Sequence, residues 1–176
     1  EQRKFRDAEE LFLVQGRKLV EELLASDLDV LEIHALEGTA LEMGLAQAVI
    51  SPAHDLDRMG TLQQGNEVVA IVRKPRPRAP GLLGPKELVL AMDGISDPGN
   101  LGTLLRIADW FGIEHMWCSM DCVEVYNPKC VQASMGSIFR VHVNYMDIAT
   151  TLTGAAHSGV RTYKAEASGA DVFRTD

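Results

Sequence analysis

The sequence has 176 residues, of which 46% are hydrophobic and 24% charged, enough to bury a core in one large or two small domains. Its apolar stretches are short runs such as Leu88–Met92, far below the roughly 20 residues of a membrane-spanning helix, so we expect no membrane partner. The formal net charge of −8 argues against nonspecific nucleic-acid binding by the whole surface.

The cysteines and the first residues indicate a cytoplasmic protein. Cys118, Cys122 and Cys130 are an odd number and do not resemble a secreted disulfide framework, so we expect reduced, buried thiols. Their spacing differs from the CxxC pairing of zinc sites, and we expect no metal. Residues 1–6 lack the apolar segment of a secretory signal, which makes the cytoplasm the expected location.

The first part of the chain alternates short strands and helices. The apolar run Phe12–Val14 is followed by Gly16 and then by leucines and valines at helical spacing, which predicts a strand, a turn and a helix. Later signals predict strands at Val30–Ile33, Ala48–Ile50 and Val68–Val72, and a helix that begins with Ser51 as N-cap and Pro52 in its first turn. Residues 1–74 therefore predict a small α/β sandwich.

Residues 75–85 contain four prolines and two glycines. Proline fixes φ and lacks an N–H donor, so this stretch predicts a linker between domains at 1–74 and 86–176. Four positive charges lie within Arg73–Arg78, and a second basic group near the start comprises Arg3, Lys4, Arg6, Arg17 and Lys18. These groups fit RNA binding, and they equally fit solvated charges beside a linker.

The second domain begins with a strand at Leu88–Met92 whose uninterrupted apolar character is typical of a strand buried on both faces. Asp93–Gly99 is rich in turn formers, and Asn100 stands where a helix N-cap is expected. Gly112 should end this helix, whose apolar stripe comprises Leu101, Leu104, Leu105, Ala108 and Phe111.

The alternation of strands and helices continues to residue 165. Helices are expected from Asn127-Pro128 through Ala133 and over Ile148–Ala156, and strands at His115–Cys118, Phe139–Val143 and Val160–Ala165. Together these elements predict an open, mostly parallel α/β sheet of four strands. We expect Trp110 and Trp117 in the core, with base stacking as an alternative for Trp110.

In open α/β sheets the ligand lies beyond the carboxyl ends of the strands, so the loop after Met92 is the first candidate site. Gly94, Gly99 and Gly102 would let a polyanion approach the backbone, and Arg106 could hold a phosphate. Alternatively, the glycines only form a turn and Arg106 pairs with Asp109 or Glu114. The glycine spacing does not fit the GxGxxG pattern of dinucleotide-binding enzymes.

Two motifs resemble the SpoU RNA methyltransferases of the SPOUT superfamily. Residues 97–106, DPGNLGTLLR, are similar to the family's D-P-x-N-x-G-x-x-x-R segment, and residues 127–140, NPKCVQASMGSIFR, to its following helix and S-x-G-x-x-F-R turn. Residues 12–20, FLVQGRKLV, look like the family's amino-terminal substrate-binding domain, which is related to kink-turn-binding ribosomal proteins. The sequence departs from the family at Gln132, where many relatives have arginine, and at Gln15, where glutamate is usual.

The resemblance implies an S-adenosylmethionine-dependent 2′-O-methyltransferase of RNA, most naturally ribosomal RNA, that forms a homodimer. It places the family's catalytic asparagine and arginine at Asn100 and Arg106. A guanidinium is a poor base, so we expect Arg106 to hold a phosphate and to stabilise charge on the ribose oxygen, while Asn100 orients the reactants. The RNA contacts expected from the resemblance and the basic groups are Arg3, Lys4, Arg17, Lys18, Arg73, Lys74, Arg76, Arg78, Ser134 and Arg140.

The family's cofactor site implies one further expectation. Its members continue with a glycine-glutamate segment and an S-x-N segment, which form a trefoil knot around the cofactor, and neither occurs before Asp176. We therefore expect a longer protein in which only Lys164, Ala165 and Glu166 of this sequence border the cofactor, and a segment that is not active by itself. The alternative is a non-catalytic RNA-binding protein without the knot.

Overall fold

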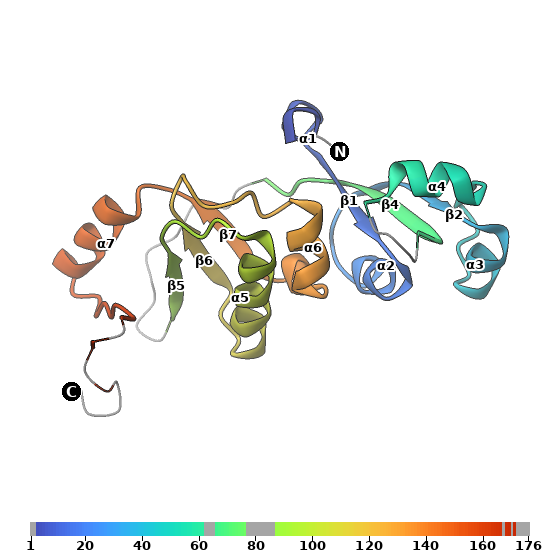
Figure 1. Ribbon diagram of the computed structural model, residues 1–176. Coiled ribbons are helices and arrows are strands. Elements are labelled where there is room, and N and C mark those ends of the chain that lie inside the picture. The colour runs from blue at the N-terminus through green and yellow to red at the C-terminus, as the bar shows by residue number, and fades with distance from the viewer. Residues whose placement is uncertain (1–2, 62–65, 77–86, 167, 170, 172–176) are drawn as a thin grey trace.

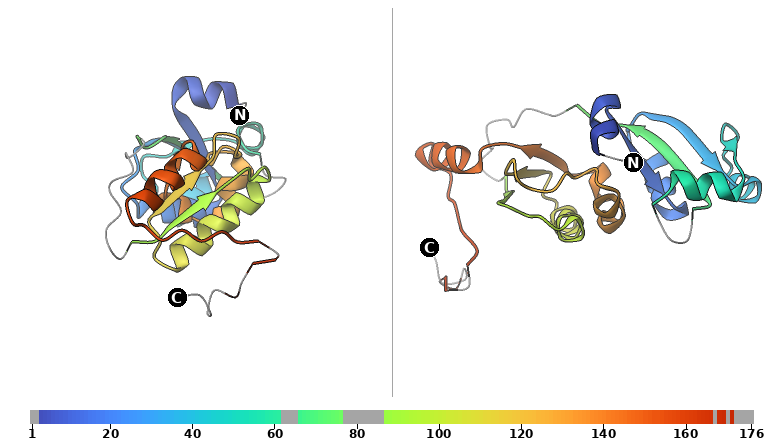
Figure 2. Two further views of the ribbon diagram at one scale, coloured as in Figure 1. Left: turned by 90° about the vertical axis from the view of Figure 1, so that its left-hand side faces the viewer. Right: turned by 45° about the horizontal axis from the view of Figure 1, so that its top comes forward.

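The computed structural model describes residues 3–61, 66–76, 87–166, 168–169 and 171. Figure 1 shows two α/β units next to each other, one built from α1 to β4 and the other from β5 to α7. The second view in Figure 2 shows the same arrangement, with α7 at the end of the molecule that lies far from the N-terminal unit.

The N-terminal unit is a four-stranded sheet in the order β1-β4-β2-β3. β4 pairs antiparallel with β1 and β2, and β2 pairs parallel with β3. The valines of β4 are buried in its centre, and α2 covers the sheet with Leu19, Val20 and Leu23 at helical spacing. The elements are α1 (Arg3–Glu9), β1 (Leu11–Gln15), α2 (Arg17–Leu24), β2 (Val30–Ala35), α3 (Glu37–Glu42), β3 (Val49–Ile50), α4 (Ala53–Met59) and β4 (Val68–Arg73).

The four predicted strands and two predicted helices of this unit are confirmed, whereas α1 and α3 were not predicted from the sequence. Ser51 is not the helix cap that we expected. Pro52 occupies the N-cap position of α4, and the Ser51 hydroxyl donates to the carbonyl oxygen of Val49.

The second unit is a parallel sheet in the order β5-β6-β7, in which Val89, His115 and His142 lie side by side. Met116 and Cys118 of β6 pack into the core with Leu101 and Leu105 of α5. The elements are β5 (Val89–Met92), α5 (Pro98–Trp110), β6 (His115–Cys118), α6 (Pro128–Ser134), the 3₁₀ helix η1 (Ser137–Phe139), β7 (His142–Tyr145) and α7 (Ile148–His157).

Three expectations for this sheet are wrong. The predicted strand at 160–165 has no ladder partner among the described residues, and its side chains are mostly exposed. Among the described residues β5 pairs with β6 alone, and its side chains are half-buried or exposed rather than buried on both faces. Phe139 belongs to η1, because Met135 and Gly136 adopt positive φ and turn the chain before β7 begins.

The two units share one hydrophobic core cluster and a buried ionic contact. α6 packs against β1, and the ring of Phe12 lies 4.7 Å from that of Tyr126. The Glu124 carboxylate accepts from Arg6 at 2.5 Å and from Lys74 at 2.8 Å. In the predicted linker, Pro75 and Arg76 are exposed, and residues 77–85 lie outside the described part of the chain.

Candidate functional site

The helix α5 carries both predicted catalytic residues and begins just after the carboxyl end of β5. Its N-cap is Asp97, not Asn100, because Pro98 favours the first helical position and the Asp97 carboxylate accepts from the Asn100 N–H at 2.9 Å. Lys129 of α6 lies 2.8 Å from the same carboxylate. The Lys129 ammonium and the Asn100 N–H lower the pKa of Asp97, so its charge anchors the start of the helix.

Arg106 is exposed and has no ion pair among the described residues. The alternative that Arg106 pairs with Asp109 or Glu114 is therefore wrong for the described structure, since Asp109 accepts from Arg140 and from Ser137 at 2.9 Å. Asn100 is exposed as well. Six residues of helix separate Asn100 from Arg106 by about 9 Å along the axis and about 120° around it. A substrate that lies across the first two turns of α5 could contact both.

Of the three glycines considered in the sequence, Gly102 serves helix packing and Gly94 serves a turn. A Cβ at Gly102 would lie 2.6 Å from the Ala133 Cβ and 2.7 Å from the Cys130 carbonyl oxygen, so this glycine lets α5 and α6 approach closely. Gly102 is buried there, which corrects the expectation that it admits a polyanion. Gly94 has φ +65, as a turn glycine does.

Ser134 and Arg140, two of the predicted RNA contacts, bond to other residues of the protein. Ser134 is fully buried, and its hydroxyl donates to the Val131 carbonyl, so it offers no surface to RNA. Arg140 bonds to both oxygens of Asp109 and to Glu22 of α2 at 2.8 Å, which neutralises its charge and joins the two units. These carboxylates raise the pKa of Arg140, and Arg140 and Ser137 lower the pKa of Asp109.

The remaining basic side chains divide into paired and unpaired groups. Arg73 pairs with Asp29, Lys74 with Asp7 and Glu124, and Arg17 with Glu42 and Glu67. Within the basic stretch Arg73–Arg78, the pairing of Arg73 and Lys74 reduces the positive charge that these two residues can offer to RNA. In the described ranges, the exposed cations without an ion pair include Lys4, Lys18, Arg76 and Arg106. The side chain of Arg3 and residue Arg78 lie outside the described part.

The predicted cofactor residues do not form a pocket in the part of the chain that the structure describes. Lys164, Ala165 and Glu166 are exposed, Lys164 pairs with Glu166 at 3.1 Å, and none of the three lines a cavity given for the described residues. On this geometry these three residues alone do not fit an enclosed cofactor, and we assign them no contact.

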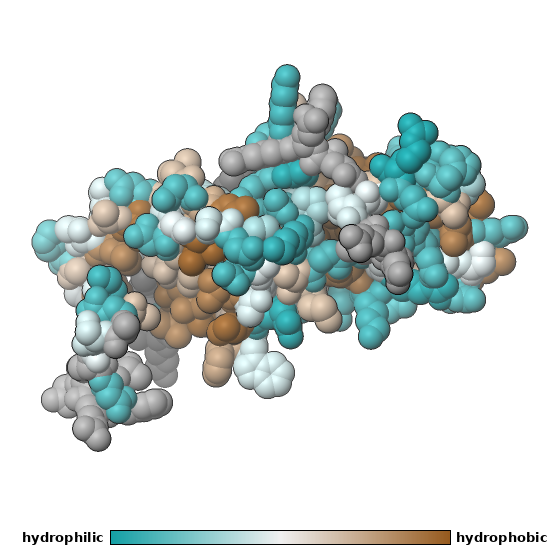
Figure 3. Space-filling model, in the orientation of Figure 1, coloured by the Kyte–Doolittle hydropathy of each residue, from teal (hydrophilic) through white to brown (hydrophobic). Residues whose placement is uncertain are grey.

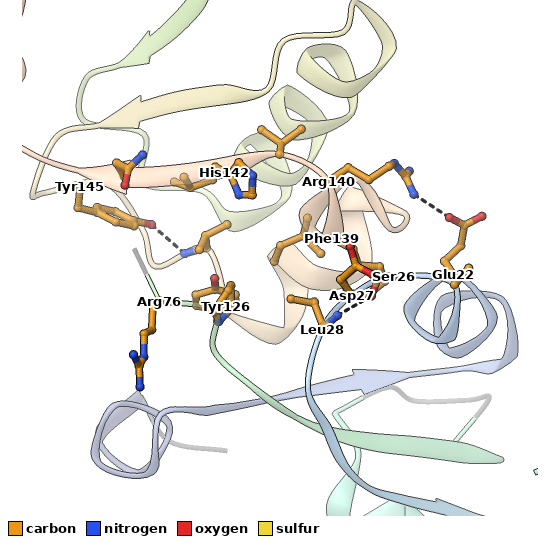
Figure 4. Close-up of a pocket in the computed structure, with 17 residues that line it drawn as sticks. Glu22, Ser26, Asp27, Leu28, Arg76, Tyr126, Phe139, Arg140, His142 and Tyr145 are labelled. Carbon is orange, nitrogen blue, oxygen red and sulfur yellow. Dashed lines mark hydrogen bonds and ion pairs between the residues drawn. The ribbon is translucent and has the colours of Figure 1, made fainter. Parts of the chain in front are cut away.

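Two cavities lie where the units meet. One of about 760 Å³ lies between β7 and the segment after α2, and Figure 4 shows Phe139 and His142 across from Asp27 and Leu28. The other, of about 840 Å³, surrounds the N-terminus of α2. The first includes Asn144, and the second includes Gln15 and Gln132, whose side-chain amide donates to the Gln15 carbonyl at 2.9 Å.

Asn144 and Gln15 are the residues that sequence reasoning missed as cavity residues. Each is buried, and each has a side-chain nitrogen without a hydrogen-bond partner. Gln15 was noted only as a departure from the family pattern, and nothing in the sequence marks Asn144. Their position depends on how the two units pack.

The three cysteines are buried, and burial raises the pKa of Cys118 and Cys130 to about 12, which keeps both thiols protonated. Trp117 is buried as predicted, whereas Trp110 is 85% exposed and does not belong to the core.

The described residues contain no cluster of His, Cys, Asp and Glu that could hold a metal. Within the same residues, every helix is too short or too polar to cross a membrane.

The model of the SpoU rRNA Methylase family matches residues 87–176, half of the sequence. The chain belongs to this family. A curated relative, the 23S rRNA (guanosine(2553)-2'-O)-methyltransferase RlmP of Bacillus subtilis, is 28% identical over 156 residues, which are 86% of this chain and 61% of that protein.

Solved structures agree with the SpoU assignment. A TrmH-family protein from Porphyromonas gingivalis matches with a TM-score of 0.77 and 32% identity, over 90% of this chain and 63% of that one. The SpoU methyltransferase AviRb from Streptomyces viridochromogenes, in complex with AdoMet, matches with a TM-score of 0.76 over 90% of this chain and 64% of its own, and its 22% identity supports the fold alone. The predicted α/β fold of SPOUT type is confirmed, and the chain spans about three-fifths of these relatives (61–64%).

Proposed function

We propose that this SpoU-family protein is a ribose 2′-O-methyltransferase of ribosomal RNA that uses S-adenosylmethionine. The observation that carries the proposal is the exposed, unpaired guanidinium of Arg106, on the helix that starts beyond the carboxyl end of β5. The relatives support the reaction, since RlmP is named for 2′-O-methylation of a 23S rRNA guanosine and AviRb was solved with AdoMet.

Arg106 and Asn100 take complementary roles in this proposal. A guanidinium stays protonated in proteins, so Arg106 does not accept the proton of the 2′-hydroxyl. It holds the adjacent phosphate and stabilises the negative charge that develops on the ribose oxygen. The neutral amide of Asn100 donates and accepts hydrogen bonds, which orients the nucleotide along α5. S-adenosylmethionine would supply the methyl group and leave as the thioether S-adenosylhomocysteine, and the proton of the 2′-hydroxyl would pass to water.

The N-terminal unit is proposed to bind the RNA substrate, with the start of α2 as a phosphate contact. The N–H groups of the first turn of α2 have no intrahelical partner, and the exposed residue Lys18 lines the cavity at this end of the helix. Gln15 lines this cavity and is 3% exposed, and its buried side-chain nitrogen has no hydrogen-bond partner among the described residues. Lys4 and Arg76 provide further unpaired charge, whereas the predicted contacts Arg17, Arg73 and Lys74 contribute less because carboxylates pair with them.

We also propose a cytoplasmic homodimer. Figure 3 shows apolar residues gathered over the second unit around β5 and β6. On α5, Ile107, Trp110 and Phe111 are 43%, 85% and 72% exposed. At spacings of three and four residues these side chains share one face, beside Arg106, and a second copy that covers them would lie next to the candidate site. Trp110→Glu should then shift the light-scattering mass at micromolar concentration from dimer to monomer; a wild-type monomer contradicts the dimer.

The experiment that tests the proposed function measures transfer of a labelled methyl group from S-adenosylmethionine to ribosomal RNA from a strain without the gene. The full-length protein is compared with Arg106→Ala and with Arg58→Ala, an exposed arginine on α4. Arg106→Ala should lower kcat/KM by at least about 100-fold, as expected for removal of one transition-state donor, with unchanged thermal stability. Arg58→Ala should leave transfer unchanged.

Two results would count against this assignment. Unchanged turnover of Arg106→Ala removes Arg106 from the mechanism. RNA binding by the full-length protein without any methyl transfer supports the alternative of a non-catalytic RNA-binding protein.

A further inference from the structure

We infer that the cleft between the two units binds one unstacked base of the RNA substrate, at a nucleotide other than the one that is methylated. The inference rests on the proposed RNA substrate and names a subsite for it. The cleft of about 760 Å³ has the size of a small-molecule site and is distinct from the exposed face of α5 that carries Asn100 and Arg106.

The first observation is an unsatisfied donor. Asn144 of β7 is 7% exposed, lines the cleft, and has a side-chain nitrogen without any hydrogen-bond partner. Buried polar atoms are almost always paired, so an unpaired amide beside a cavity indicates that a ligand supplies the acceptor. The ring nitrogens and carbonyl oxygens of a nucleobase are such acceptors.

The free edge of β7 adds donors and acceptors next to Asn144. The backbone N–H groups of His142 and Met146 bond to carbonyl oxygens at Glu114 and Cys118, on the β6 side. In an extended strand successive N–H groups alternate between the two edges, so those at 143 and 145 point away from β6. Among the strands of the described residues β7 lies at one edge of the sheet, and residues 138–145 all line the cleft. A base edge could therefore bond to the strand as well as to Asn144.

Aromatic side chains make the walls rigid. The Tyr145 hydroxyl donates to the Val123 carbonyl at 2.6 Å and accepts from the Val125 N–H at 2.8 Å. Burial raises the pKa of Tyr145 and of Tyr126, which keeps both rings neutral. Figure 4 shows Phe139, His142 and Tyr126 around the same space, where a planar base could stack.

The charges around the cleft favour a base over a phosphate inside it. Arg140 is balanced by Glu22 and Asp109, and Asp27 adds a negative charge to the rim. Arg76 is the cation in the lining without an ion pair among the described residues, and Figure 4 places it at one end of the cleft. A neutral base therefore fits the interior, and the neighbouring phosphate fits the end at Arg76.

The test compares methylation kinetics of full-length variants on 23S ribosomal RNA. Asn144→Asp keeps the shape of the side chain and replaces the donor by a carboxylate. It should raise KM for RNA by at least about tenfold, the effect of losing one base contact, with kcat unchanged at saturating RNA. The matched control Gln47→Glu makes the same amide-to-acid change at an exposed position outside both cavities and should leave KM unchanged.

A second variant keeps the test decisive if Asn144→Asp does not fold. Asp27 is exposed on the rim, so Asp27→Trp should obstruct the cleft without changing a buried side chain. Removal of a negative charge should by itself favour RNA binding, so an increase of KM in this variant reports obstruction of the cleft. With 4-thiouridine-substituted 23S transcripts, ultraviolet light should crosslink RNA to the peptide that contains residues 141–146, and Asp27→Trp should abolish that crosslink.

The outcomes separate the two proposals. If the wild-type protein does not methylate RNA, the proposed function fails. If it does, and folded Asn144→Asp and Asp27→Trp both keep the wild-type KM and crosslinks, the cleft inference is overturned while the proposed function stands.

Discussion

The close contact between α5 and α6 gives a stability prediction whose sign depends on geometry. Gly102 lies inside α5, where alanine is intrinsically favoured over glycine by roughly 0.5–1 kcal/mol. An added Cβ would, however, lie 2.7 Å from the Cys130 carbonyl oxygen and 2.9 Å from the Ser134 nitrogen. Backbone atoms of a packed helix cannot rotate away, so we expect an overpacking cost of about 1–3 kcal/mol that exceeds the gain. Gly102→Ala should lower the free energy of unfolding by about 1–2 kcal/mol.

Gly154 in α7 is the matched control, because a Cβ there meets no atom within 4 Å. Gly154→Ala should raise the free energy of unfolding by about 0.5–1 kcal/mol. Urea unfolding followed by circular dichroism, with equal m-values for both variants and the wild type, measures the difference. If Gly102→Ala stabilises the protein as much as Gly154→Ala does, the reasoning from the helix contact is refuted. If it weakens RNA binding at unchanged stability, Gly102 serves substrate approach after all.

Three further predictions concern ionisable side chains. Glu124→Gln should lower the free energy of unfolding by about 3–5 kcal/mol, because Arg6 and Lys74 lose their shared carboxylate in a nearly buried contact. Urea unfolding measures this loss, with Glu37→Gln at an exposed position as the control. The pKa of Asp109 is lowered in the folded protein, so its contribution to the free energy of unfolding is present above the ordinary aspartate pKa of about 3.9 and is lost as the pH falls through the lower folded-state value. The difference in stability between the wild type and Asp109→Asn should therefore shrink below about pH 4. A difference that stays constant with pH contradicts the pairing of Asp109 with Arg140. Burial raises the pKa of Cys118 and Cys130 to about 12, so both thiols should resist iodoacetamide at pH 8 until urea unfolds the protein, and rapid labelling of the folded protein would show that they are accessible.

The parts of the fold that local sequence determines were predicted well. The strand His115–Cys118 is observed with the predicted bounds, and Asn127 caps α6 through a bond to the Lys129 N–H. The predictions fail where the structure of a segment depends on contacts with other parts of the chain. An apolar run such as 160–165 becomes a strand only beside a partner edge, and nothing in the described residues pairs with it. The sequence offers both Asp97 and Asn100 as N-cap of α5, and Asp97 is the N-cap because Pro98 favours the first helical position.

The candidate site shows the same division. The motif placed Asn100 and Arg106 on one helix, and both are exposed. The RNA contacts were less predictable, because a basic residue in the sequence carries no sign of the carboxylate that the fold brings to it. Glu124 is 50 residues from Lys74 in the sequence, and Glu22 is 118 residues from Arg140, yet each pair is bonded.

This pairing bears on the net charge of −8, which at first argues against RNA binding. Carboxylates that hold the two units together, Glu124 with Lys74 and Glu22 with Arg140, also cancel positive charge that a charge count along the sequence assigns to RNA. What matters for RNA is the positive charge left unpaired, and Lys18 and Arg106 retain theirs at two separate places, the start of α2 and the exposed face of α5. Each phosphate contact contributes about one counterion to the salt dependence of binding, so a few such contacts give weak general affinity for RNA. In the proposed function, selection of one ribosomal nucleotide then has to come from contacts with bases, which is the role that we infer for the cleft at Asn144.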